Sequence, residues 1–265
     1  MRFFGGARYL PVMKKPLLIF ALSLALPVQP AAAQKTVVAI FAHPDDERIV
    51  APLLSRYARE GHRVYLVVAT DGGKGVTPHA GIPAGDSLVA IRAEETRCAT
   101  RELGINAPIL LGHPDAGLAS FTALGKLRTD LERVIGELRP DAILTFGREG
   151  GTGHPDHRLV GDMVTEIVQA APAEIPLYFP GLPLERMTDA PPARPAVRLV
   201  AERYLNVRVA YTLADFAAAE RAYVCHRSQY TAEQAAANMR YVQHGYRGRV
   251  HLRAWNGGPA RTELF

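Results

Sequence analysis

The sequence predicts a single α/β domain with a mostly parallel sheet and helices on both of its faces. The chain has 265 residues, of which 48% are hydrophobic and 22% are charged, as in ordinary globular proteins. Short continuous apolar runs alternate with longer segments of helical periodicity, which is typical of βαβ units. Right-handed crossovers between parallel strands then place helices on both sides of the sheet.

The first half of the domain carries the clearest alternation. Residues Thr36–Phe41 (TVVAIF) are apolar and β-branched throughout, which predicts a strand buried on both faces. Residues Glu47–Glu60 have apolar side chains at helical spacing, and Gly61 is a natural helix end. Next come a predicted strand Arg63–Thr70, a glycine-rich loop Asp71–Asp86, a helix Ser87–Leu103 and a strand Pro108–Leu111.

The second half repeats the pattern and then becomes less regular. Residues Asp141–Phe146 (DAILTF) predict another buried strand, and Pro155 is well placed at the first position of a helix that continues to Ala170. Further helices are predicted at Leu124–Leu138, Leu213–His226 and Ala232–Tyr241, and one or two strands within Arg198–Val209. The proline-rich segment Ala171–Pro195 is predicted to be irregular, and the tail after Gly245 to be surface structure.

Residues 1–33 predict a secretory signal peptide. A basic stretch without acidic residues, Met1–Lys15, precedes the ten-residue apolar run Leu17–Leu26, and three alanines ending at Ala33 form an A-x-A cleavage site. A run of ten falls short of the roughly 20 residues that a spanning helix needs. We therefore expect an exported, periplasmic or secreted protein without a membrane anchor, its single domain formed by residues 34–265. Translation from Met1 and translation from Met13 both fit this pattern.

Charge and cysteine content exclude several classes of partner and site. The 31 basic and 26 acidic residues become 27 and 26 when the predicted leader is removed. No dense Lys/Arg cluster is left, which argues against nucleic acid as a partner. Cys98 and Cys225 form no C-x-x-C motif, so a thiolate metal site is excluded. Export permits a disulfide between them, but two buried thiols are the interpretation we favour.

Two polar clusters follow predicted strands, at the sheet edge where parallel α/β folds bind ligands. The first is residues 42–47 (AHPDDE), and the second is residues 153–157 (GHPDH). Within them, His43, Asp46 and His157 offer two imidazoles and one carboxylate, a ligand set that leaves a coordination position open as in catalytic zinc sites. A His-Pro or Asp-Asp pair alone is commonly a turn or cap. Two such clusters at equivalent sheet positions favour a metal site.

The remaining residues of the clusters suit hydrolysis. A metal lowers the pKa of bound water to about 7, and Asp45, beside the ligand Asp46, is free to take its proton. His154 could stabilise an oxyanion or protonate a leaving amine, and Asp156 could fix the tautomer of a neighbouring histidine. The sequence contains neither G-x-G-x-x-G nor G-x-S-x-G, which argues against a dinucleotide enzyme and a serine hydrolase.

These motifs resemble those of the PIG-L/LmbE-like zinc-dependent N-acetylglucosaminyl de-N-acetylases. AHPDDE and GHPDH carry the resemblance, and Ile91–Glu95 (IRAEE) and His226–Gln229 (HRSQ) are also similar to the family. The resemblance implies a Rossmann-like fold with zinc at the C-terminal strand edge and an N-acetylated amino sugar or glycoconjugate as substrate. It implies these site residues: metal ligands His43, Asp46 and His157, general base Asp45, oxyanion or acid group His154 with Asp156 in support, and Arg92 on a sugar hydroxyl or phosphate.

Two alternatives stay open. The loops Asp71–Asp86 and Ala171–Pro195 do not match the family, so the substrate does not transfer from it, and a carbamoyl or longer acyl amide is also compatible. A protein of another class, a non-catalytic periplasmic sugar- or metal-binding protein of the same fold, is the second hypothesis. Zinc is the metal we expect, although the ligand set also accepts Fe²⁺.

Overall fold

A computed structural model of the chain describes residues 1–6, 33–189 and 197–265. Most of the predicted leader lies outside these ranges, so the signal peptide and its cleavage stay a prediction. The chain divides after Ala33, and the unit Gln34–Phe265 contains all the helices and strands of the described residues. None of the described helices combines the length and apolar character needed to cross a bilayer.

The unit Gln34–Phe265 is built on a seven-stranded sheet of order β3-β2-β1-β4-β5-β7-β6. The first five strands in this order are parallel neighbours, and β7 runs antiparallel to both β5 and β6. The strands are β1 Thr36–Phe41, β2 Arg63–Thr70, β3 Ile109–His113, β4 Ala142–Leu144, β5 Leu177–Pro180, β6 Val207–Ala210 and β7 Arg249–Ala254. The predicted α/β class with a mostly parallel sheet is confirmed.

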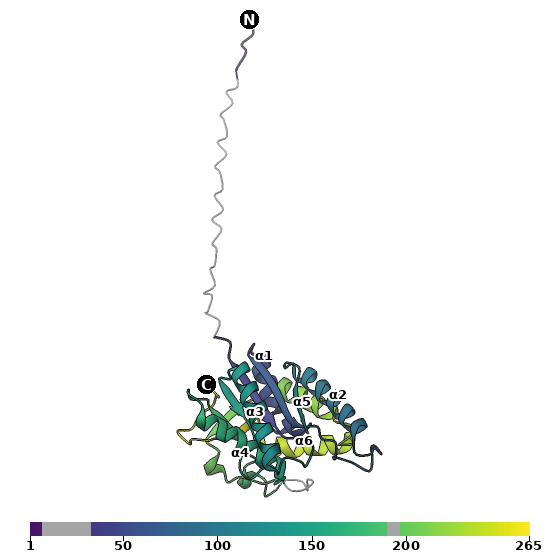
Figure 1. Cartoon of the computed structure of the whole chain (residues 1–265). Coiled ribbons are helices and arrows are strands. Elements are labelled where there is room, and N and C mark those ends of the chain that lie inside the picture. The colour runs from purple at the N-terminus through teal and green to yellow at the C-terminus, as the bar shows by residue number, and fades with distance from the viewer. Residues whose placement is uncertain (7–32, 190–196) are drawn as a thin grey trace. The chain divides into compact units, whose positions relative to one another are not determined.

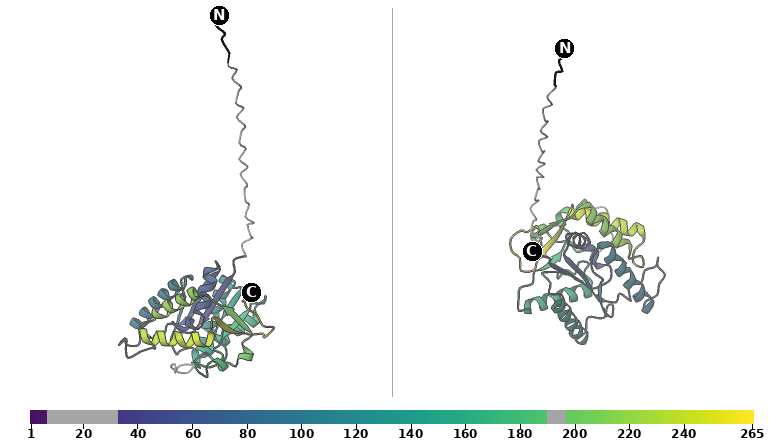
Figure 2. Two further views of the ribbon diagram at one scale, coloured as in Figure 1. Left: turned by 180° about the vertical axis from the view of Figure 1, so that it is seen from behind. Right: turned by 90° about the horizontal axis from the view of Figure 1, so that it is seen from above.

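Helices cover both faces of the sheet (Figures 1 and 2). Alternate residues of β1 face opposite sides: Val37 and Phe41 belong to one apolar core, and Val38 and Ile40 to the other. The first core packs against α1 (Ala51–Arg59), α2 (Asp86–Leu103), α5 (Leu213–Val224) and α6 (Ala232–Tyr246). The second packs against α3 (Phe121–Leu138) and α4 (Pro155–Ala170). Burial on both faces explains why the β1 sequence is apolar without alternation.

Three short 3-10 helices complete the described secondary structure. They are Asp46–Ile49, Leu184–Arg186 and Glu202–Tyr204. The predicted helix Glu47–Glu60 is therefore two elements, a 3-10 turn followed by α1. α3 begins three residues earlier than predicted, because the Ser120 side chain caps it by accepting a hydrogen bond from the Ala123 amide.

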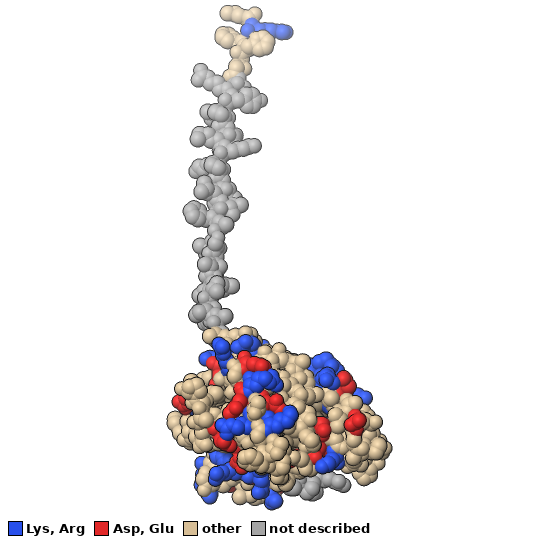
Figure 3. Space-filling model, viewed as in Figure 1, with Lys and Arg blue, Asp and Glu red and all other residues tan. Residues whose placement is uncertain are grey.

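Ion pairs along the solvent face of α3 give that surface a mixed charge. Each joins residues four apart: Lys126–Asp130, Arg128–Glu132 and Arg133–Glu137. Figure 3 shows basic and acidic side chains interspersed over the face in view. Solvent screens such pairs, so they contribute little to stability.

Two predictions about the second half of the sheet were wrong. β5 lies inside the segment predicted to be irregular, and β7 lies in the tail predicted to be surface structure. β5 has only four residues and ends in Pro180, so its strand character comes from pairing with β4 and β7. β7 lies between β5 and β6, and its residues Val250 and Leu252 are fully buried. Both strands depend on partners far away in sequence, which local patterns do not reveal.

The preference for two free thiols was also wrong. Cys98 in α2 and Cys225 at the end of α5 form a disulfide, with their Cα atoms 5.8 Å apart. The cysteines are 127 residues apart in sequence, and they meet because α2 and α5 pack side by side on one face of the sheet. The described residues contain no free cysteine.

The strand order creates a crevice between β1 and β4. From β1 the chain continues to β2 on one side, whereas β4 pairs with the opposite edge of β1. The segments that leave the carboxyl ends of β1 and β4 therefore diverge to opposite faces. Open α/β sheets bind ligands at such a switch point. Both polar clusters of the sequence lie there.

Gly161 allows α4 to approach the end of β4 closely. A Cβ atom at this position would overlap with the carbonyl oxygen of Phe146. We therefore expect Gly161→Ala to lower the free energy of unfolding by about 1–3 kcal/mol, as overpacking does. Gly136→Ala is the matched control, because nothing lies within 4 Å of its added methyl group. That variant should gain about 0.5–1 kcal/mol from helix propensity. Urea denaturation measures both, and equal shifts would refute the close-approach argument.

Candidate metal centre and catalytic site

The structure brings the three predicted metal ligands together. His43 Nδ1 lies 3.0 Å from His157 Nε2, and Asp46 Oδ1 lies 3.2 Å from the same nitrogen. Asp46 Oδ2 is 3.6 Å from His43 Nδ1. All three side chains are buried. Although 114 residues separate the two histidines, their donor atoms converge on one point at the crevice.

Local backbone geometry makes the two adjacent aspartates diverge. Asp45 adopts a left-handed conformation, with φ 97°, directly before the 3-10 turn that Asp46 begins. This conformation is uncommon for a residue other than glycine and is found at functional sites. Asp46 folds back to accept a 2.8 Å hydrogen bond from the His43 amide, while Asp45 points elsewhere. The Asp46 carboxylate thus lies with the two histidines, and the Asp45 carboxylate lies beside this group.

His157 is fixed by the first turn of α4. Pro155 occupies the start of the helix, and the His154 ring caps it by accepting a hydrogen bond from the Asp156 amide at 3.2 Å. The His157 ring stacks on Phe146 with centroids 4.3 Å apart, and its Nδ1 lies 2.8 Å from the Gly150 carbonyl oxygen. The carbonyl holds the Nδ1 proton, so Nε2 presents its lone pair to His43 and Asp46.

The donor set suits a divalent cation. The opposite nitrogen of His43, Nε2, lies 3.2 Å from Asp115 Oδ1 and 3.4 Å from Asp156 Oδ2. Burial lowers the pKa of His43, but contacts with these carboxylates and Asp46 outweigh it and raise the pKa to about 11. The carboxylates of Asp46, Asp115 and Asp156 thus face one imidazole, an arrangement that suits a bound cation. The nitrogen and oxygen donors match zinc.

Two further donor sets share His43. His43, His154 and His157 form one, and His43, Asp115 and Asp156 form the other, each with ligand atoms within 4.8 Å of one another. The second set approaches Nε2, the nitrogen that faces away from His157 and Asp46. Carboxylates in that position orient a metal-binding histidine and fix its tautomer. We therefore assign Asp115 and Asp156 to support of His43.

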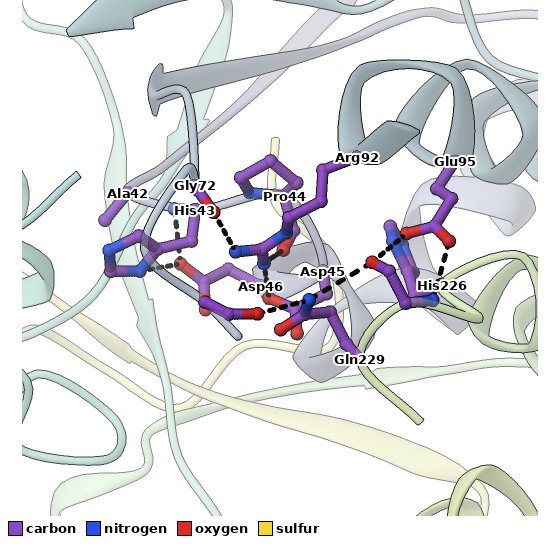
Figure 4. A network of polar contacts seen from close by, with 12 residues as sticks. Ala42, His43, Pro44, Asp45, Asp46, Gly72, Arg92, Glu95, His226 and Gln229 are labelled. Carbon is purple, nitrogen blue, oxygen red and sulfur yellow. Dashed lines mark hydrogen bonds and ion pairs between the residues drawn. The ribbon is translucent and has the colours of Figure 1, made fainter. Parts of the chain in front are cut away.

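Asp45 lies beside the donors, with both carboxylate oxygens close to other side chains (Figure 4). Tyr230 donates a 2.6 Å hydrogen bond to Oδ2. Burial raises the pKa of Tyr230 well above its usual value, so the phenol keeps its proton and acts as the donor. The Arg92 guanidinium lies 3.4 Å from Oδ1. These contacts fix the orientation of a carboxylate that holds no place among the three predicted ligands.

Arg92 has partners other than the expected substrate groups. Its side chain donates to the carbonyl oxygens of Pro44 and Gly72, and it is 3% exposed. It therefore ties the loop after β1 to the loop after β2 (Figure 4). This geometry supports a positioning role near Asp45, and a contact with a sugar hydroxyl or phosphate stays a prediction.

His154 and Asp156 are both present at the site, but with different partners from those expected. His154 lines the cavity, and its ring centroid is 4.6 Å from that of His43. Burial and the neighbouring histidines lower the pKa of His154. The Asp156 carboxylate accepts a 2.9 Å hydrogen bond from the Ala116 amide and lies beside His43. Asp156 thus supports His43 with its carboxylate, and its backbone amide donates to the His154 ring.

The HRSQ segment after α5 reaches the site through Gln229, which lines the cavity of the metal donors. His226 Nε2 lies 2.6 Å from Glu47 Oε1, and both side chains are almost fully buried. Ser228 donates to Glu95 through its amide and its hydroxyl, each at 2.7 Å. Gln229 donates to the Gly75 carbonyl at 2.8 Å. The similar motifs noted in the sequence are therefore joined directly, and Figure 4 shows Glu95, His226 and Gln229 of this network.

Sequence reasoning missed Asp115 and Tyr230. Asp115 follows β3 at the same sheet edge as the two clusters, and its position after a strand was the available signal. Tyr230 comes directly after HRSQ, but 185 residues separate it from Asp45. No local pattern indicates that contact.

Comparisons with known proteins identify similar sequences and structures. Residues 38–168 match the family model described as PIG-L: GlcNAc-PI de-N-acetylase. The 1D-myo-inositol 2-acetamido-2-deoxy-alpha-D-glucopyranoside deacetylase of Mycolicibacterium smegmatis is 31% identical over 156 residues, which cover 51% of this chain and 54% of that protein. The enzyme of the same name from Mycobacteroides abscessus is 33% identical over 152 residues, covering 50% and 54%. The chain thus spans about half the length of the curated relatives it matches.

Solved structures share the fold. N,N'-diacetylchitobiose deacetylase from Pyrococcus horikoshii superposes with a TM-score of 0.64 at 20% identity, covering 84% of each chain. GalB, the 4-carboxy-2-hydroxymuconate hydratase of Pseudomonas putida, gives 0.62 at 16% identity, covering 87% of this chain and 99% of its own. The fold therefore occurs with more than one reaction. The family match and the curated relatives show that this chain carries a domain of the PIG-L family at residues 38–168.

Proposed function

We propose that the protein is a metal-dependent amide hydrolase that removes the N-acetyl group from an amino sugar of the N-acetylglucosamine class. The observation that carries the proposal is the convergence of His43, Asp46 and His157 beside the separately held carboxylate of Asp45. These side chains line a cavity of about 410 Å³, which is large enough for a sugar. The family description and the names of the curated relatives support the substrate class.

In this proposal His43, Asp46 and His157 hold the metal. Zinc is the ion we expect from two imidazoles and a carboxylate, and Fe²⁺ also accepts such ligands. A divalent ion at this place supplies Lewis acidity toward a carbonyl oxygen and toward water.

The other residues of the cavity handle protons. Asp45 takes a proton from the attacking water as the water adds to the amide carbon. His154, on another part of the cavity wall, donates a hydrogen bond to the developing oxyanion or a proton to the departing nitrogen. The C–N bond breaks as the nitrogen takes a proton from His154 or from the protonated Asp45 carboxyl, and the products are acetate and a free amine.

Tyr230 positions the general base. Tyr230→Phe removes the hydrogen bond to Asp45, and we expect kcat to fall about 10- to 100-fold, the value of a lost bond to a charged group. KM should change little, because the substitution keeps the ring and removes only the hydroxyl that contacts Asp45. Tyr223→Phe is the matched control: its ring packs 4.7 Å from that of Tyr230, but its hydroxyl accepts a bond from Asn238. Steady-state kinetics of both variants decide the point, and equal losses would refute the role of Tyr230.

Product analysis tests the proposed reaction. The purified protein, loaded with Zn²⁺ or Fe²⁺, is incubated with a panel of N-acetyl, longer N-acyl and N-carbamoyl amino sugars, and the products are identified by mass spectrometry. We expect acetate and free amine from the N-acetyl compounds. If only a longer acyl or a carbamoyl group is released, the protein is still a hydrolase of this type, but the group that it removes is not acetyl.

The non-catalytic alternative leaves Asp45 unexplained. A protein that only binds a sugar or a metal has no need for an oriented carboxylate beside the ligand carboxylate, nor for its hydrogen bond with Tyr230. Tight binding of an N-acetyl sugar without release of acetate would favour this alternative.

We also propose that the domain acts after export. The predicted leader supports this proposal, and so does the disulfide between Cys98 and Cys225, since disulfides persist in oxidising compartments. The intact mass of protein from the periplasm of an expressing bacterium tests it, and cleavage after Ala33 is the expected result.

A further inference from the structure

A second cavity, of about 520 Å³, adjoins the cavity of the metal donors. Arg48, Thr152 and Gln229 line both of them. A compound anchored by its amide at the metal donors therefore has room to extend past these three residues. The proposed deacetylation does not use this second cavity.

One face of α6 forms its long wall. The lining residues come in pairs at helical spacing: Glu233 and Gln234, Ala237 and Asn238, Tyr241 and Val242. With a rise of 1.5 Å per residue, they extend over about 13 Å. α6 begins shortly after Gln229, and near its other end Tyr246 donates a hydrogen bond to the carbonyl oxygen of Ile49, the neighbour of Arg48. Both ends of the helix thus lie near a shared residue, and Ala237, Tyr241 and Val242 give the wall apolar surface between them.

The facing wall is a loop fixed in place by hydrogen bonds. Thr77 donates from its hydroxyl to the Ser228 carbonyl at 2.6 Å. The His79 ring contacts the Arg227 carbonyl at 2.9 Å. A loop held in this way does not have to be ordered when a ligand binds, so little affinity is lost to that cost.

Charge argues for an uncharged ligand. Among the described lining residues, Arg48 is the one lysine or arginine, and its guanidinium already contacts other groups of the protein. Its guanidinium donates to the Asp45 carbonyl at 2.8 Å and lies 5.8 Å from the centre of the Tyr230 ring. Glu233 adds a negative charge. A phosphate or carboxylate entering this cavity would find no uncommitted lysine or arginine among those residues.

We infer that the substrate carries an uncharged apolar group, aryl or alkyl, on the amino sugar, and that the cavity beside α6 binds this group. The inference rests on the proposed deacetylase function. Apolar surface moved out of water contributes about 25 cal/mol per Å², so burying about 60 Å² is worth roughly a factor of ten in affinity. Ala237, Tyr241 and Val242 offer such a surface on α6.

A series of glycosides with one sugar tests the inference. Methyl, phenyl and octyl glycosides of N-acetylglucosamine, together with its 1-phosphate, are compared by kcat/KM. We expect the phenyl or octyl compound to exceed the methyl compound by about tenfold or more. The 1-phosphate should be no better than the methyl compound. Equal values across the series, or a preference for the phosphate, would overturn the inference.

Variants of α6 locate the effect. Val242→Asp should reduce the ratio of phenyl to methyl kcat/KM to about one, and the ratio is taken within each variant so that a general loss cancels. Ala237→Trp is a second variant in case Val242→Asp does not fold. Ala237 is exposed and lines the cavity, so the larger side chain should fill the cavity and reduce the same ratio to about one. Gln243→Asp adds the same charge on the exposed side of α6 and should keep the ratio.

Binding without turnover separates this inference from the proposed function. Phenyl and methyl glucoside lack an acetamide, and calorimetry measures their binding to wild type, Val242→Asp, Ala237→Trp and Gln243→Asp. Tighter binding of phenyl glucoside, lost in Val242→Asp or Ala237→Trp and kept in Gln243→Asp, supports the apolar subsite even if no glycoside is deacetylated. Deacetylation of all glycosides with no phenyl preference in binding overturns the subsite and leaves the deacetylase proposal standing.

Discussion

Asp45→Asn is expected to keep the bound divalent ion and to lose about 10²- to 10⁴-fold in kcat, the usual contribution of a general base. The asparagine has the same shape, and its carbonyl oxygen can still accept the hydrogen bond that Tyr230 gives to Asp45. It cannot take a proton from water. The predicted ligands His43, Asp46 and His157 are unchanged, so metal content should stay at the wild-type level.

Turnover and metal content are measured on the same preparation, by product release and by plasma mass spectrometry. Asp141→Asn is the matched control, because its carboxylate binds the Thr36 amide at the amino ends of β1 and β4, away from the site. It should retain activity. Full activity of the Asp45→Asn protein would refute the assigned base, and loss of metal would show that Asp45 is a ligand.

His157→Ala is expected to lose both the metal and the activity. The ring supplies one of the three predicted donors, and its Nε2 is the atom nearest to both His43 and Asp46. Two donors from a single loop hold an exchangeable ion weakly, so dialysis should leave about zero metal per chain instead of about one. Activity should fall below detection.

His62→Ala is the control for a general effect of losing a histidine. His62 lies in the turn before β2, where its ring accepts a hydrogen bond from the Lys35 amide. That variant should bind metal normally. An equimolar metal content in the His157→Ala protein after dialysis would remove His157 from the ligand set.

The meeting of the two polar clusters was largely predictable because it depends on the edge of a parallel sheet. His43 and His157 each follow a buried strand, and the carboxyl ends of parallel strands share one edge. The sequence did not show that β1 and β4 are neighbours. That pairing, together with the left-handed backbone of Asp45, is what brings the donors within hydrogen-bond distance.

The parts that were missed depend on contacts distant in sequence. Asp115 supports His43 from the loop after β3, and Tyr230 reaches Asp45 from the segment before α6. β5 and β7 are strands because of their neighbours, and the Cys98–Cys225 disulfide forms because α2 and α5 share a face. Side-chain periodicity reports burial of a segment, but not which segment covers it.

Anomalous diffraction from crystals loaded with Zn²⁺ tests the central claim most directly, because it locates the ion independently of activity. We expect one strong peak at the zinc edge, in contact with His43, Asp46 and His157 and not with Asp45. A peak between His43, Asp115 and Asp156, or no peak near His157, would contradict the account of how the two loops form the site.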